Sequence, residues 1–195
     1  MKKTGVDPAE IRFILGTHGH YDHVGAAHLW KQEFGCLLYL HELDREQVEA
    51  GDSVKTSAAL LYGTKSEPCK VDGTIAEGDT WEGDGFTVEA MYTPGHTMGS
   101  VSFDVTAGEY RLLIAGDAIW GGYSEKIGSN EKAWFETLDK ITARHYDFYT
   151  FGHVNPQLIA DADARLKEAK MAFANYYNPW FKTFYETCLL YTSPS

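Results

Sequence analysis

The chain has 195 residues, of which 44% are hydrophobic, and this is enough for the core of one domain of ordinary size. It carries 17 basic and 28 acidic residues, and the net charge of -11 repels polyanions, so we expect no nucleic acid partner. The three cysteines, Cys36, Cys69 and Cys188, are too few and too widely spaced for a disulfide framework or a Cys-x-x-Cys metal site.

The first residues have a basic start with no apolar run behind it, and no window of the sequence approaches the length of a membrane span, about 18 apolar residues. We therefore expect no membrane partner. The lack of a signal peptide favours the cytoplasm, whereas a signal peptide lost upstream would place the protein in the periplasm. The sequence leaves the compartment and the oligomeric state open.

The predicted elements begin with a strand, a loop, a helix and a second strand. Residues 11–15 are a short apolar run that ends at Gly16 and predicts a buried strand. Apolar residues recur at helical spacing over 24–34, and Gly35 supplies the C-terminal stop of that helix. Residues 36–40 predict the next strand, which completes a unit typical of α/β folds.

Residues 42–70 combine a short acidic helix with a polar connection of little periodicity, so we expect surface structure without chemistry there. Short strands divided by glycine-rich turns are predicted for the next segment. The expected strands cover residues 74–75, 80–81, 86–91, 101–105 and 111–115, with a hairpin at Ala107-Gly108. The middle of the chain is therefore predicted to be mostly β.

The last third of the chain is predicted to alternate between helix and strand. A helix over 130–144 places Trp134, Leu138 and Ile141 on one face, and residues 147–151 predict a strand. A final helix is predicted to begin at residues 155–156, where asparagine at the N-cap precedes proline, and to reach about residue 173.

The strongest chemical signal is the loop of residues 17–23, with the sequence THGHYDH, directly after the first predicted strand. His18 and His20 alternate and can point the same way from an extended loop, while Asp22 and His23 turn toward a second point. Imidazole and carboxylate donors suit Zn²⁺ and other first-row divalent metals. A lone His-x-His pair would favour a polar turn without metal. This loop adds a carboxylate and a third imidazole, so it has donors for two metal ions.

The loop resembles the His-x-His-x-Asp-His motif of the metallo-β-lactamase superfamily, and three later segments resemble the other landmarks of that family. These are residues 93–97 (TPGHT), 113–117 (LIAGD) and 151–153 (FGH). The resemblance implies that His18, His20 and His96 bind one metal, that Asp22, His23 and His153 bind the other, and that Asp117 bridges them. It implies two Zn²⁺ ions per chain, although iron or manganese also suits these donors.

The resemblance also implies a fold, a four-layer αβ/βα sandwich in which two sheets pack face to face with helices outside. In this family several strands normally precede the first motif, so we expect a chain that lacks the N-terminal part of the fold and has an incomplete first sheet. We expect one domain over residues 1–188. Residues 189–195 break the character of the preceding helix and are interpreted as a non-native tail. One alternative is that such a fragment is not a working enzyme.

For function, the resemblance implies a hydrolase with a small-molecule substrate. Two metal ions about 3.5 to 4 Å apart can share a water and lower its pKa toward about 7. The metal-bound hydroxide would then attack the carbonyl of an ester, thioester, lactone or amide. Asp22 is expected to orient the proton of that hydroxide in addition to binding metal, which makes it the predicted catalytic residue.

Two other functions stay open at this point. Aspartate in the place of Asp117 is usual in glyoxalase-II-like thioesterases and lactonases, but residues 20–39 also resemble the third subclass of β-lactamases. A mono-iron sulfur dioxygenase would use the same motif through His18, His96 and Asp117 alone. Residues 120–123, with the sequence WGGY, either line a substrate mouth or form a packed turn.

Overall fold

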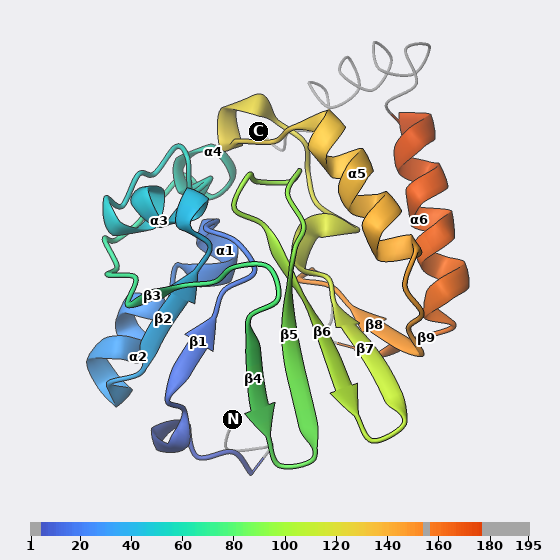
Figure 1. Cartoon of the computed structure of the whole chain (residues 1–195). Coiled ribbons are helices and arrows are strands. Elements are labelled where there is room, and N and C mark those ends of the chain that lie inside the picture. The colour runs from blue at the N-terminus through green and yellow to red at the C-terminus, as the bar shows by residue number, and fades with distance from the viewer. Residues whose placement is uncertain (1–4, 154–156, 177–195) are drawn as a thin grey trace.

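The computed structural model describes residues 5–153 and 157–176. Two β-sheets pack against each other, and helices cover the outer side of each sheet (Figure 1). The expected α/β fold with two sheets between helical layers is therefore confirmed. The predicted tail at residues 189–195 and Cys188 lie outside the described residues.

The smaller sheet is parallel and has the order β1-β2-β3 in the described part of the chain. Its strands are β1 (Phe13–Leu15), β2 (Leu37–Leu40) and β3 (Gly73–Thr74). The helices of this half are η1 (Pro8–Glu10), α1 (Tyr21–Val24), α2 (Ala27–Phe34), α3 (Glu42–Glu49) and α4 (Ala58–Tyr62). Gly35 ends α2 in the left-handed conformation, with φ 67°, as its sequence position predicts.

The larger sheet has the order β4-β5-β6-β7-β8-β9 and is antiparallel except between β7 and β8. Its strands are β4 (Thr80–Gly83), β5 (Phe86–Tyr92), β6 (Val101–Ala107), β7 (Tyr110–Ile114), β8 (Phe148–Thr150) and β9 (Ile159–Ala160). The remaining helices are η2 (Gly116–Ala118), η3 (Glu125–Ile127), α5 (Glu131–Thr142) and α6 (Ala162–Tyr176). The hairpin predicted at Ala107-Gly108 joins β6 to β7.

Alternation along the strands explains why the fold has layers, because successive side chains of a strand point to opposite faces of its sheet. Leu38 and Leu40 of β2 pack with Val48 between the smaller sheet and its helices. Tyr39, between them in the sequence, packs in a second cluster with Phe103 of β6, between the two sheets. The smaller sheet is therefore covered on both faces.

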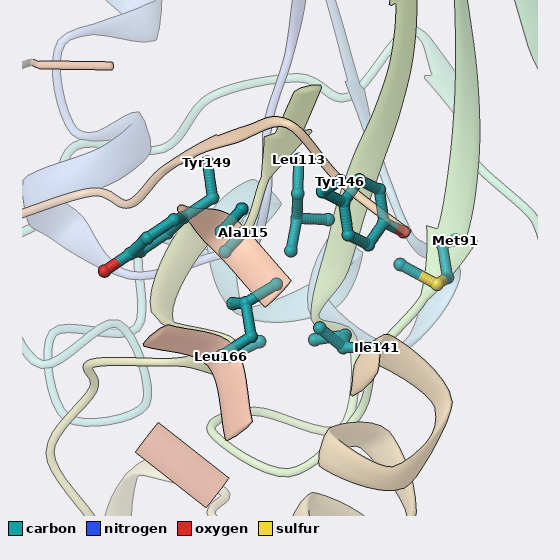
Figure 2. Close-up of a cluster of buried hydrophobic side chains, with 9 residues drawn as sticks. Met91, Leu113, Ala115, Ile141, Tyr146, Tyr149 and Leu166 are labelled. Atoms are coloured by element: carbon teal, nitrogen blue, oxygen red, sulfur yellow. The ribbon is translucent and has the colours of Figure 1, made fainter. Parts of the chain in front are cut away.

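A third cluster lies between the larger sheet and helices α5 and α6, which lie side by side on its outer face (Figure 1). Figure 2 shows Met91 and Leu113 of the sheet near Ile141 of α5 and Leu166 of α6. Each fully buried aliphatic side chain of this kind contributes roughly 1.5 to 3 kcal/mol relative to exposure. The predicted apolar face of α5 is confirmed by the burial of its three residues.

The predicted start of the last helix is wrong. Residues 159–160 form β9, which pairs antiparallel with β8 at the edge of the larger sheet. α6 begins only after Asp161, which adopts a left-handed backbone conformation with φ 57° and separates β9 from the helix. Apolar residues at helical spacing could not reveal this strand, because β9 is defined by its hydrogen bonds to β8 and not by a pattern in its own sequence. The predicted cap at residues 155–156 lies outside the described residues.

The prediction that residues 42–70 form only surface is also wrong. Val48 and Cys69 belong to the core under the smaller sheet, and Asp44, Thr56 and Ser57 are buried. α3 and the connection that follows α4 therefore contribute to the core under the smaller sheet. Within the described ranges, no helix has both the length and the apolar character required to cross a bilayer.

Candidate metal centre

The seven predicted ligands lie on four loops that each follow the carboxyl end of a strand. The loops are residues 17–23 after β1, 93–97 after β5, 115–118 after β7 and 151–153 after β8. Strands β5, β7 and β8 run in the same direction, so their carboxyl ends share one edge of the larger sheet. The Val101 amide donates to the Thr17 carbonyl oxygen over 2.7 Å and joins this edge to the smaller sheet. All four loops meet at one end of the molecule, the upper end in Figure 1.

His18, His20 and His96 form the first and more deeply buried group, with exposed fractions of 1%, 2% and 3%. One ring nitrogen from each lies within 4.8 Å of the other two. The closest pair is His20 Nδ1 and His96 Nε2, which are 2.9 Å apart. The structure thus brings together the three histidines that the sequence places in one group.

Backbone carbonyl groups decide which nitrogen of two of these rings carries the proton. The Gly122 carbonyl oxygen accepts a hydrogen bond from His96 Nδ1 over 2.8 Å, and the Ile127 carbonyl oxygen accepts one from His20 Nε2 over 3.2 Å. Because a carbonyl oxygen can only accept, the other nitrogen of each neutral ring is a lone pair. The close contact of these two lone pairs is repulsive unless a cation lies between them, so their arrangement suits a metal.

Asp22, His23 and His153 form the second group. Asp22 Oδ2 lies 3.6 Å from His23 Nε2 and 3.7 Å from His153 Nε2. The Asp22 and His153 side chains are 21% and 29% exposed, so this group is the more accessible one.

Asp117 lies between the two groups and is 4% exposed. Its Oδ2 atom is 2.8 Å from His153 Nε2 and 3.3 Å from His96 Nε2, and its Oδ1 atom is 3.2 Å from His23 Nε2. One carboxylate therefore contacts histidines of both groups, which is the position that a bridging ligand needs.

The surroundings hold the buried groups in the protonation states that bind metal. Burial, together with nearby histidines, lowers the pKa of His18 well below 6.5, and burial lowers the pKa of His20 and lowers that of His96 to about 4. Burial alone would raise the pKa of Asp117, but the proximity of His23, whose Nε2 atom lies 3.2 Å from Oδ1, and of the other histidines outweighs it and lowers that pKa. At neutral pH the first group therefore offers neutral imidazoles beside an ionised carboxylate. Burial alone would lower the pKa of His23, but the Asp117 and Asp22 carboxylates outweigh it and raise that pKa, so a metal would displace a proton there.

Two glycines allow the backbone to come this close to the ligands. A Cβ atom on Gly152 would lie 2.3 Å from His23 Cε1 and 2.9 Å from Asp117 Oδ1. A Cβ atom on Gly121 would lie 2.6 Å from His96 Nδ1. Any larger residue at either position would displace a ligand side chain.

Three buried polar atoms of this centre lack a hydrogen-bond partner within the part of the chain that the structure describes. They are His18 Nε2, His23 Nε2 and Asp117 Oδ1. An unpartnered buried polar atom costs roughly 1 to 3 kcal/mol, so three together need an explanation. A divalent metal would bind all three, and imidazole with carboxylate is a donor set that first-row metals accept. The residues present therefore fit a metal.

Asp44 is a residue of this centre that the sequence did not reveal. It lies in the first turn of α3 and is 2% exposed. Its Oδ2 atom accepts hydrogen bonds from the Gly19 amide over 2.7 Å and the Thr97 hydroxyl over 2.8 Å, and its Oδ1 atom accepts one from the Gly99 amide over 3.1 Å. The carboxylate ties the loop of His18 to the loop that follows β5. No motif distinguishes Asp44 from the other acidic residues of its helix.

A family model described as the metallo-beta-lactamase superfamily matches residues 1–153. The probable metallo-hydrolase YqgX of Bacillus subtilis is 28% identical over 164 residues, which cover 78% of this chain and 72% of YqgX. The hydroxyacylglutathione hydrolase GloC of Haemophilus influenzae is 31% identical over 119 residues, which cover 57% of this chain and 51% of GloC. The chain spans 72%, 50% and 59% of the length of three curated relatives.

Solved structures give the same fold. A β-lactamase from Chitinophaga pinensis is 26% identical, and the match covers 93% of this chain and 77% of that one with a TM-score of 0.72. The similarity therefore includes both sheets and the four loops that carry the ligand candidates.

Proposed function

The chain belongs to the metallo-β-lactamase superfamily and is a metallo-hydrolase, and from this premise we propose that it holds two zinc ions and cleaves an ester, thioester, lactone or amide. The observation that carries the proposal is the pair of donor groups joined by Asp117, whose two oxygens contact histidines on both sides. The substrate is a small molecule, and the net charge of -11 argues against nucleic acid.

We assign the ligands by group. His18, His20 and His96 would hold one zinc, Asp22, His23 and His153 the other, and Asp117 both. The lone pairs fixed by the Gly122 and Ile127 carbonyl groups support the first assignment. The buried atoms His23 Nε2 and Asp117 Oδ1, which lack a hydrogen-bond partner among the described residues, support the assignment of Asp117 as a ligand of both zinc ions.

When bound, zinc would supply Lewis acidity and a water with a pKa near about 7, against 15.7 in bulk water. The protein contributes the placement of proton acceptors around that water. The Asp22 carboxylate lies at the accessible side of the centre, 3.7 Å from His153 Nε2, where it can accept or orient a proton of the attacking water. The buried histidines exclude solvent from the opposite side.

An amide bond in a β-lactam ring is the second candidate substrate. The 26% identity to the β-lactamase from Chitinophaga pinensis favours it. The similarity to the hydroxyacylglutathione hydrolase GloC favours a thioester instead. Parallel assays with a chromogenic cephalosporin, a lactone and a thioester would rank the three substrates.

Metal analysis of the purified chain, coupled to oxygen consumption, tests the proposal first. Two zinc ions per chain and hydrolysis that a chelator abolishes would support it. One iron per chain with oxygen uptake would instead identify a dioxygenase and overturn the proposed reaction.

Asp22→Asn tests the proton role. It should lower kcat by about 100-fold or more, the usual contribution of a positioned acid or base, because the amide cannot accept the proton. Urea unfolding should show unchanged stability, since Asp22 is accessible. Asp84→Asn, in the turn between β4 and β5, is the control and should keep full activity. Normal turnover in Asp22→Asn would refute the assignment.

A further inference from the structure

The candidate metal centre is accessible on the side of Asp22 and His153. The histidines of the first group are at most 3% exposed, whereas the Asp22 and His153 side chains are 21% and 29% exposed. A substrate carbonyl therefore reaches the centre past these two side chains, and the residues beside them contact the groups attached to that carbonyl.

Trp120 stands beside His153. Its ring centroid lies 5.4 Å from the His153 ring and 6.0 Å from the Phe151 ring. The Trp120 residue is nevertheless 55% exposed. A large apolar ring that is supported on one side and open on the other can cover an apolar ligand group.

Tyr62 stands beside Asp22. Its ring centroid lies 5.6 Å from the ring of Tyr21, the residue that precedes Asp22 in α1. Tyr62 is 48% exposed, and the preceding residues of α4, Leu60 and Leu61, are 47% and 66% exposed. The end of α4 thus presents an apolar surface next to a candidate ligand.

Each of these two aromatic residues therefore lies next to one member of the accessible pair Asp22 and His153, whose Oδ2 and Nε2 atoms are 3.7 Å apart. We propose that Trp120 and Tyr62 form the binding site for the apolar acyl group of the substrate. The acyl group is attached to the carbonyl carbon itself, so it extends from the centre toward the residues beside Asp22 and His153. This assignment rests on the proposed hydrolase function and names its substrate class.

The ion pairs of the two carboxylates show which charged side chains lie beside the acyl group. In the described part of the chain, every ion pair of Asp22 and Asp117 is made with a histidine and none with lysine or arginine. Recognition of the acyl group is therefore assigned to the two apolar rings and not to a lysine or arginine paired with these carboxylates. The apolar rings contribute by covering the hydrocarbon of the acyl group.

The test compares two esters with the same leaving group, p-nitrophenyl acetate and p-nitrophenyl hexanoate, on the zinc-loaded full chain. We expect kcat/KM to be at least about tenfold higher for the hexanoate, from partial burial of its additional methylenes. Trp120→Ala and Tyr62→Ala should each reduce this ratio several-fold. Tyr62→Phe should keep the ratio, because it keeps the ring and removes only the hydroxyl.

Tyr110→Ala is the matched control. Tyr110 is 52% exposed and packs on one aromatic ring, that of Phe148, but it lies in the β6–β7 hairpin, at the opposite end of these strands from the centre. The ratio of hexanoate to acetate should be unchanged in this variant. Circular dichroism and zinc content confirm that each variant is folded and loaded.

Binding of two metal-chelating probes, acetohydroxamate and hexanohydroxamate, separates the two proposals. Tighter binding of hexanohydroxamate, by about tenfold in the wild type and less in Trp120→Ala, supports the acyl site even if no ester is cleaved, in which case only the reaction is wrong. Metal-dependent hydrolysis with equal affinity for both probes and an unchanged ester ratio in Trp120→Ala overturns the acyl site and leaves the hydrolase proposal intact.

Discussion

The donor atoms of the centre are selected by neighbours that are not themselves ligands. The carbonyl groups of Gly122 and Ile127 fix the protons of two imidazoles, and Asp44 holds the loops from which these imidazoles project. Hydrogen-bonding partners of this kind orient metal ligands, and their removal typically weakens metal affinity by 10- to 100-fold.

Asp44→Asn should weaken zinc affinity by about tenfold or more. All three hydrogen bonds to the carboxylate come from donors, so an amide NH₂ group in place of either oxygen would face another donor. Isothermal titration with a competing chelator measures the affinity.

Asp104→Asn is the matched control for Asp44→Asn. Asp104 is 3% exposed and binds Arg111 and Arg144 on the larger sheet, away from the candidate ligands. Both variants should lose about 2 to 4 kcal/mol in free energy of unfolding, because each removes a buried carboxylate with several partners. Only Asp44→Asn should lose zinc affinity, and an equal loss in both would show that Asp44 acts through stability alone.

The metal-free protein should become less stable as the pH falls from about 6.5 to about 4. The pKa of His96 is lowered from 6.5 to about 4, so the unfolded chain takes up a proton in this range before the folded protein does. The loss should reach about 3 kcal/mol for His96, with none above pH 6.5. Urea unfolding with chelator present checks this, and His96→Gln should have a smaller pH dependence.

At the residue scale, the sequence predicted which side chains come together where the residues form a contiguous motif. His18 to His23 are contiguous, and a strand followed by a polar loop places them together. Asp44 could not be predicted, because its role arises from contacts with Thr97 and Gly99, far along the chain.

Among the elements, helix α5 has a second task besides covering the larger sheet. Its Trp134 Nε1 donates to the Ala118 carbonyl oxygen over 2.6 Å, next to the bridging candidate. Its Thr137 hydroxyl donates to the Pro94 carbonyl oxygen over 2.6 Å, in the loop of His96. One helix therefore fastens two ligand loops.

Thr137→Val should reduce stability by about 1 to 3 kcal/mol, since it keeps the shape of the side chain and leaves the Pro94 carbonyl without its partner. Zinc affinity should also fall, because the loop of His96 is less firmly held. Thr142→Val on the same helix is the control, because its hydroxyl bonds to the Leu138 carbonyl oxygen within the helix. Unchanged zinc affinity in Thr137→Val would show that α5 does not position the loop.

The sequence predicted elements where one face repeats regularly, as on α5, and where glycine ends a helix, as at Gly35. It did not predict β9, because two residues at a sheet edge carry no periodicity of their own. The layer arrangement, two sheets face to face with helices outside, came from the family resemblance, and the strand order and register were not predicted because they depend on contacts between distant segments.

On the scale of the whole molecule, metal removal should lower the thermal midpoint. A ligand present at 1,000 times its Kd stabilises the folded state by about 4 kcal/mol, and each kcal/mol corresponds to about 2 to 4 °C for a chain of this size. We therefore expect calorimetry to show a fall of about 10 °C on adding chelator and recovery on adding zinc. His18→Gln should show a smaller shift, and equal midpoints for the wild type with and without chelator would contradict a metal centre in the fold.

The four ligand loops come from both sheets, and this arrangement affects when metal can enter a newly made chain. The ligand candidates of the first loop must contact residues that are translated much later: His18 and His20 contact His96, and Asp22 and His23 contact His153. Contacts between such distant segments form late in folding. Metal uptake should therefore follow sheet formation, and an excess of zinc should slow unfolding more than it speeds refolding. The rate of zinc uptake, followed with a metal-responsive dye, would then report the rate of the last folding step, the packing of the two sheets against each other.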